Sequence, residues 1–390
     1  MNGRFAERKS PLVAGIVLGL VCAITRPAYA ETSWGQALHL IGELRPTLVD
    51  YELPGHPRQV GRGHTGTIGT LALRWTYEER IRIEAGILAR LAFAHDFQEE
   101  LGAFPLLSVT LTPFGPWATL RLGSLNIRHG FHPAVLDEDR YAYGRNYEET
   151  YNRSLVPEAR QDLGGDPFMP MESGAQLLVD LEPIHAELYL DWQLLETTGH
   201  REKFAVGVLA EYRGHWVDAG FQYRLVHYGG QQFTQVVEAR RLGLDAKRQP
   251  TSLAAFITPK PLHLGPLRLE LPVTFLQGRL VQAPGGRETS HRGLELGADL
   301  WLYDALRLGY RIWLPKDGVA LDVSEDGDPT YSGPRSHRAT LQLVSVYGLA
   351  ELSGRLDLVF AEGNNKVQYL TVTTLTFRFE PELWVDTRLP

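Results

Sequence analysis

The residues of this chain that could do chemistry gather in one long interval, 127–173, where acidic and basic side chains mix with aromatic residues and prolines. A loop of this length is uncommon unless it has a function or is disordered, and this composition does not resemble low-complexity disorder. If the interval folds into a pore, its charges would set ion or solute preference electrostatically. The candidate constriction residues are Arg121, on the strand before this interval, and, within the interval, Arg128, His129, Asp137, Glu138, Asp139, Arg140, Arg145, Glu148, Glu149 and Arg153.

Candidate catalytic groups are few. Ser290-His291 and Ser336-His337 each place a hydroxyl beside an imidazole, as outer-membrane phospholipases and deacylases require. Adjacent residues of a strand face opposite sides, however, so neither pair brings a nucleophile to its base. Asp218 with His215 and His227 could be an Asp/His protease set on the outer rim, but the spacing is not distinctive. We therefore expect no catalytic residue and no enzyme activity.

Metal and cofactor signals are weak as well. His129 and His132 lie three residues apart, which leaves a transient divalent-ion site as an alternative. The stretch 322–328 begins like a calcium loop, but Gly333 stands where the bidentate acid is needed. The single cysteine, Cys22, excludes a Cys-x-x-Cys-His haem attachment. We expect no metal and no cofactor.

The elements that position these residues are strands. In 184–194 the residues Ile184, Leu188 and Trp192 fall on one face, and Glu187 and Asp191 fall on the other. Because side chains alternate along a strand, one face is apolar and the other is charged. This is the pattern of a transmembrane barrel with a polar lumen.

The same alternation recurs along the chain, in runs of about 9–13 residues that suffice for a tilted strand to cross a bilayer. At roughly 20 residues per strand with its share of loop, the length predicts an all-β transmembrane antiparallel β-barrel of about 16–18 strands. A soluble secreted β-sandwich, solenoid or lectin-like protein also alternates, but the polar face here is charged on many successive strands. Aromatic residues near strand ends are typical of an interfacial girdle, and they include Trp75, Tyr77, Trp117, Trp216, Tyr228, Tyr303, Trp313 and Tyr331.

Residues 1–30 have the features of a secretory signal. A basic start with Arg4, Arg8 and Lys9 precedes an apolar stretch, and Ala28-Tyr29-Ala30 is a small-x-small cleavage site. A short N-terminal anchor is the alternative. The whole chain has a formal charge of −7, and removal of this +3 segment leaves −10, which argues against nucleic acid as a partner. We expect 31–390 to form one barrel in the cell outer membrane, in contact with its lipid.

Residues 119–131, Thr-Leu-Arg-Leu-Gly-Ser-Leu-Asn-Ile-Arg-His-Gly-Phe, resemble an element of two outer-membrane channel families. In phosphate-selective (O/P-type) porins and alginate-export-type barrels, an early strand carries a basic residue, then Gly, with a further Gly at the start of an inward-folding loop. Arg121, Gly123 and Gly130 match these positions. The resemblance covers about fifteen residues and otherwise concerns architecture. It implies a channel with 127–173 as its constriction loop.

Together these features predict a porin-like channel for passive passage of small hydrophilic solutes or ions. One alternative is a barrel scaffold or export pore of an envelope complex, serving exopolysaccharide export or a porin-cytochrome electron conduit. Another is a barrel hydrolase acting on lipid A or phospholipid. A homo-oligomer or partners from such a complex are compatible with the first two. The last strand is expected near 367–379, and the tail 381–390 either extends it or pairs on the inside.

Overall fold

The computed structural model describes twelve stretches of the chain and leaves residues 1–34, with the proposed signal, outside the description. The described stretches are 35–52, 61–94, 97–125, 130–136, 172–194, 203–228, 247–283, 287–316, 328–347, 349–362, 367–380 and 382–386. None of the helices in these stretches is long and apolar enough to cross a membrane.

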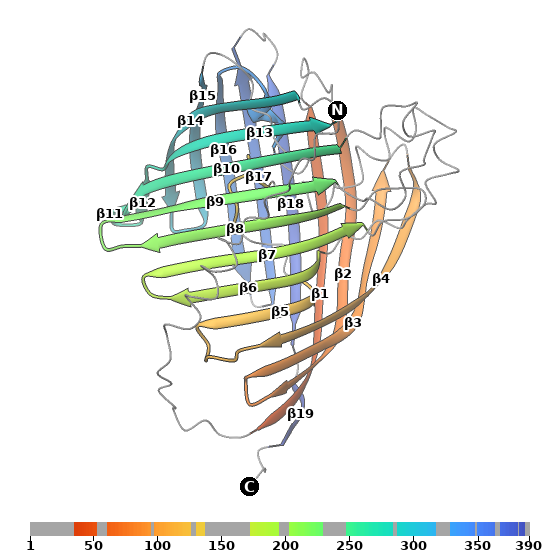
Figure 1. Ribbon diagram of the computed structural model, residues 1–390. Helices are drawn as coiled ribbons and strands as arrows, with labels where there is room; N and C mark the ends of the chain where they lie inside the picture. The colour runs from red at the N-terminus through yellow and green to blue at the C-terminus, as the bar shows by residue number, and fades with distance from the viewer. Residues whose placement is uncertain are drawn as a thin grey trace, which may run out of the picture.

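The described residues form a closed antiparallel β-barrel with sixteen wall strands, within the predicted range (Figure 1). Each wall strand pairs with the next along the chain, and β18 returns to β1, with Leu44 opposite Phe377. The wall strands are β1 (Gln36–Glu52), β2 (Gly61–Tyr77), β3 (Ile81–Ala94), β4 (Phe97–Leu111), β5 (Ala118–Ser124), β6 (Ser173–Leu181), β7 (Ile184–Leu194), β8 (Lys203–Arg213), β9 (Val217–Tyr228), β10 (Lys247–Pro259), β13 (Val273–Ala283), β14 (Arg287–Leu302), β15 (Leu306–Pro315), β16 (Ser336–Tyr347), β17 (Ala350–Ala361) and β18 (Gln368–Phe379).

Three short strands extend the wall at one rim. β11 (Leu262–Leu264) and β12 (Leu267–Glu270) continue β10 and β13 as a hairpin. β19 (Glu382–Asp386) follows β18 and pairs with the start of β1, where Leu38 lies opposite Trp384. Residues 382–386 of the C-terminal tail therefore extend the last strand.

The wall is polar inside and apolar outside, as the alternation predicts. On β7 the lumen side carries Glu187, Tyr189 and Asp191, all buried, while Leu188 remains 36% exposed on the outer side. The lumen face therefore holds the charges, and the outer face presents the apolar side chains that a bilayer stabilises.

The two rims differ in their connections. On one rim the strands are joined by tight turns, such as Tyr77–Arg80, where Glu78 and Glu79 have positive φ and the Arg80 amide donates to the Tyr77 carbonyl at 3.0 Å. Positive φ at both central residues is the type I′ geometry of short hairpins. On the other rim several connections are much longer, above all the one between β5 and β6.

The aromatic girdle prediction is correct for some residues and wrong for others. Trp216 and Tyr303 are well exposed at the short-turn rim, as a girdle requires. Trp313 and Tyr331 are instead buried inside the barrel. Their positions near strand ends gave no indication that a connection would fold back into the lumen.

Candidate functional site

A segment of the long interval, residues 130–136, lies inside the barrel. The His132 amide donates to Oε1 of Gln222 on β9 at 2.5 Å, and the Gln222 amide group donates to the Gly130 carbonyl at 3.2 Å. From the opposite side the Asp328 amide donates to the Pro133 carbonyl at 2.8 Å. The segment is therefore held between β9 and the connection that precedes β16.

This segment builds an apolar core within the lumen. Val135 and Leu136 have no solvent exposure, and they belong to one cluster with lumen-facing residues of five wall strands. That cluster consists of Leu125, Phe131, Ala134, Val135, Leu136, Tyr189, Leu209, Ala254, Leu276, Trp313 and Tyr331. We call it the lumen core. Burial of this apolar surface opposes a wide water-filled passage at its level.

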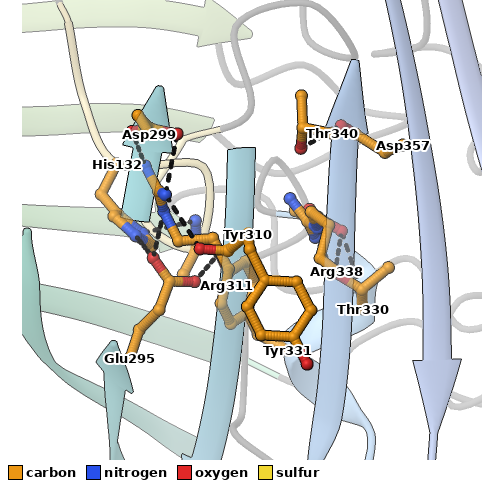
Figure 2. Close-up of polar contacts among 12 residues, drawn as sticks. His132, Glu295, Asp299, Tyr310, Arg311, Thr330, Tyr331, Arg338, Thr340 and Asp357 are labelled. Carbon is orange, nitrogen blue, oxygen red and sulfur yellow. Dashed lines mark hydrogen bonds and ion pairs between the residues drawn. The ribbon is translucent and has the colours of Figure 1, made fainter. Parts of the chain in front are cut away.

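His132 uses one ring nitrogen within the segment and the other to bind the wall (Figure 2). Its Nδ1 accepts a hydrogen bond from the Ala134 amide at 3.2 Å, so the proton lies on Nε2, which contacts Glu295 Oε1 at 3.1 Å. The Tyr331 hydroxyl donates to the other oxygen of Glu295. Because each of these groups has a partner, we interpret the set as an anchor rather than a general base.

Charged pairs surround this anchor. Arg311 lies 2.5 Å from Asp299 Oδ2, and Arg307 donates to Oδ1 of the same carboxylate at 2.8 Å. In the connection that precedes β16, Asp328 contacts Arg338 of β16. Burial raises the pKa of Asp328, but the Arg338 charge and hydrogen bonds from Thr330 outweigh it and hold that pKa below its ordinary value.

Arg121 is the one predicted constriction residue within the described stretches. It points into the lumen on β5, where its Nη2 lies 3.0 Å from Glu84 Oε2 and 3.3 Å from the Ser108 hydroxyl. Arg74 contacts the other oxygen of Glu84 at 2.6 Å. The remaining predicted residues lie outside the described stretches, and they are Arg128, His129, Asp137, Glu138, Asp139, Arg140, Arg145, Glu148, Glu149 and Arg153.

The glycines that follow Arg121 have conformations that favour glycine. Gly123 has φ +95°, and a Cβ there would lie 2.2 Å from the Leu107 carbonyl oxygen. Gly130 has φ +74° in open space. The first position therefore requires glycine for both conformation and close approach, and the second for conformation alone.

The outer wall carries a second set of polar groups, at the long-connection end of β9. His227 shares the outer face with Phe221, and its Nδ1 lies 2.9 Å from Nε2 of Gln249 on β10. The ring also packs on Phe204 of β8 at a centroid distance of 4.7 Å. The structure separates His227 from Asp218 and His215, the Asp/His set that its spacing did not favour, because those two lie at the other end of β9.

Asp218 is paired with Lys260 at 2.6 Å, and His215 packs edge-on against Trp216. No group of three or more His, Cys, Asp or Glu side chains among the described residues has the arrangement of a metal site. Two of the polar sets contain a histidine bound to a polar side chain of another segment: the lumen anchor of His132, Glu295 and Tyr331, and the outer pair of His227 and Gln249. Sequence spacing did not indicate the His227–Gln249 pair, because its partners meet only through the register of β9 with β10.

Comparison with known proteins gives one family match. The family model described as Lipid A 3'-O-deacylase-type matches residues 56–252, just over half of the chain. No curated protein sequence matches.

Solved structures similar to this chain are outer-membrane proteins. A porin triple mutant of Rhodopseudomonas blastica is 8% identical, with 88% of this chain and 100% of that chain covered and a TM-score of 0.45. Pseudomonas aeruginosa OpdL is 12% identical, with 90% and 99% covered and a TM-score of 0.45. A loop-deletion mutant of Vibrio cholerae OmpT is 9% identical, with 88% and 99% covered and a TM-score of 0.47. Because these identities and TM-scores are low, the assignment of the barrel fold rests on the strand pairing of this chain.

The expectation that the chain is not an enzyme is wrong, because the matched family is an enzyme family. The error has a physical reason. Residues that adjoin in sequence face opposite sides of a strand, whereas the groups that meet on one face of a barrel come from neighbouring strands and have no fixed sequence spacing.

Proposed function

Because the chain belongs to the lipid A 3'-O-deacylase-type family, we propose that it is an outer-membrane enzyme that hydrolyses an ester-linked acyl chain of lipid A. The observation that carries this proposal is the family match, which spans strands β2 to β9. The apolar outer wall supports it, since a lipid substrate meets the barrel from outside.

The position of such a substrate limits where the chemistry occurs. Lipid A lies in the outer leaflet, and the longer loops of bacterial barrels face the cell exterior. A catalytic side chain should therefore point outward near the long-connection rim. Of the histidines whose side chains are described in the matched range, His132 lies in the lumen and His185 and His215 lie near the short-turn rim. His227 alone meets both conditions in this set.

His227 is the proposed general base. Its imidazole would take a proton from a water molecule, whose oxygen attacks the ester carbonyl carbon. The bond from that carbon to the sugar oxygen then breaks, and the imidazolium returns the proton to the leaving oxygen. The products are a fatty acid and a sugar hydroxyl. Gln249, 2.9 Å from Nδ1, would orient the ring as a positioning residue, with its amide turned so that Oε1 accepts from Nδ1–H and the imidazole Nε2 is the nitrogen that takes the proton.

The test uses the full-length protein in detergent with purified lipid A, and mass spectrometry of the product. Wild type should release one acyl chain, and His227→Ala should be slower by roughly 10²- to 10⁴-fold. His337→Ala is the matched control, because His337 also faces outward near the same rim, against Tyr310 at 2.7 Å, but lies outside the matched range. An equal loss in both variants would refute the role of His227, and an inert wild type would refute the function.

We propose solute passage as a second function, supported by the polar lumen. In this case 130–136 would narrow the passage, and Arg121 with the charged residues of 128–153 would set the selectivity. Excision of 137–166 should then raise the conductance measured in planar bilayers and weaken charge preference. A wild-type barrel that conducts no ions would refute this second function without affecting the first.

A further inference from the structure

The outer wall carries a cluster of polar side chains on β10, β13 and β14 that neither the lumen anchor nor the His227 pair includes. The cluster consists of Thr251, Gln277, Arg279, Glu288, Ser290 and Arg292, and we call it the outer polar patch. These residues lie on neighbouring strands, with Thr251 opposite Arg279, Arg279 opposite Ser290, and Gln277 opposite Arg292.

Hydrogen bonds hold the patch in shape while leaving it accessible. Arg279 binds Glu288 through two parallel contacts of 2.8 and 3.0 Å, yet both side chains are about half exposed, at 49% and 50%. Gln277 donates to the Ser290 hydroxyl at 3.3 Å, and Thr251 donates to the Arg279 carbonyl at 3.2 Å. Arg292 is exposed.

The patch begins where the apolar outer band ends. Beyond Arg292 on β14 the outward residues are Leu294, Leu296 and Leu300, each exposed. From Leu294 to Leu302 the strand rises roughly 26 Å. A tilt of about 40° reduces this to roughly 20 Å, close to the height of an apolar band. The patch therefore lies level with lipid head groups on the long-connection side.

The chemistry of the patch fits a phosphorylated sugar. Arginine forks recognise phosphate oxygens with parallel hydrogen bonds, and two arginines against one glutamate leave a net positive charge. The hydroxyl of Ser290 and the amide of Gln277 are suited to sugar hydroxyls. Since β10 carries both Gln249 and Thr251, the patch adjoins His227 at roughly two strand spacings, about 10 Å.

We propose that the outer polar patch binds the phosphorylated sugar head group of an outer-leaflet glycolipid, with Arg279 and Arg292 on the phosphate. This assignment rests on the proposed function: the patch would hold the head group of the lipid A substrate while the ester bond lies at His227. The head group would thereby fix which acyl ester reaches the imidazole.

The experiment measures binding separately from turnover. The full-length His227→Ala protein in detergent is titrated with phosphorylated lipid A or with its dephosphorylated form, and native mass spectrometry counts the bound glycolipid. Added Arg279→Gln and Arg292→Gln should weaken binding of phosphorylated lipid A by roughly 10- to 100-fold. Binding of the dephosphorylated form should change little. Arg378→Gln is the control, since Arg378 is similarly exposed at 53% but lies at the short-turn rim.

Each outcome discriminates. A difference in gel migration between boiled and unboiled samples shows that the double variant is a folded barrel. If that folded variant binds phosphorylated lipid A with unchanged affinity, the proposal is overturned. Equal weakening by Arg378→Gln would overturn it too, because the effect would reflect overall charge. Inorganic phosphate that binds as tightly as the glycolipid would overturn the choice of ligand. Equal affinity for phosphorylated and dephosphorylated lipid A, with lipid A hydrolysis retained in the His227-intact protein, would refute the patch alone. Phosphate-dependent binding without any hydrolysis would refute the proposed function alone.

Discussion

Replacement of Leu188 by arginine tests the inside-out wall at its centre. Leu188 faces outward on β7, between Leu177 of β6 and Val208 of β8. It lies four residues beyond Ile184, where the strand begins, which is roughly 13 Å along the strand. With a tilt of about 40° this places it roughly 10 Å from that edge of an apolar band about 25 Å high. Leu188 is therefore near the midplane, where an outward arginine costs about 2–4 kcal/mol.

The assay is urea unfolding of the barrel folded into lipid vesicles, followed by tryptophan fluorescence. Leu188→Arg should lower the free energy of unfolding by about 2–4 kcal/mol. Asp191→Asn is the control on the lumen face, where an amide oxygen can still accept the Ser173 amide now 3.0 Å from Asp191, so the cost should be about 1 kcal/mol. A smaller loss for Leu188→Arg than for Asp191→Asn would refute the assignment of the two faces.

Three further predictions concern the β5 wall and the lumen. Gly123→Ala should destabilise the barrel by about 1–3 kcal/mol in the same urea assay, because Gly123 has a positive φ and its new Cβ would meet the Leu107 carbonyl oxygen. Gly354→Ala, whose Cβ would lie in open space, should not destabilise it. Equal losses in the two variants would contradict the close approach of the β5 backbone to Leu107. Leu136→Ala should lower the stability of the lumen core by about 2 kcal/mol or more, and hydrogen exchange at the amide of residue 136 should be roughly 30-fold faster. Unchanged exchange would mean that the lumen core does not hold segment 130–136 in place. Because the pKa of Asp328 is lowered, the stability that its carboxylate contributes is complete above the ordinary value of 3.8 and is lost as the pH falls below it. The fluorescence of Trp313, which packs on Tyr331 beside it, should therefore be constant from pH 7 to about 4. A fluorescence transition between pH 5 and 7 would contradict the assignment of the pH dependence to Asp328.

The wall could be predicted from the sequence because its signal is local. Alternation such as that of 184–194 depends on neighbouring residues only, and the structure confirms both the strand and the orientation of its faces. The strand number followed from length. The tail remained open between two alternatives, since its pairing with β1 joins opposite ends of the chain.

The sites could be predicted only in part, because they depend on contacts between distant segments. The position of Tyr331 near a strand end predicts a girdle residue, but its connection folds back into the barrel, where its hydroxyl binds Glu295. His132 was considered as a weak metal ligand, whereas the structure gives it Glu295 and the Ala134 amide. The His227–Gln249 pair and the outer polar patch arise from strand register. No short motif in the sequence marks them.

The most direct test of the central claim is the mass of lipid A extracted from Gram-negative cells that express the full chain. We predict that wild type yields lipid A lighter by one ester-linked acyl chain, that His337→Ala gives the same product, and that His227→Ala leaves lipid A intact although its barrel reaches the outer membrane. Lipid A of unchanged mass in cells whose outer membrane contains the folded wild-type barrel would contradict the claim.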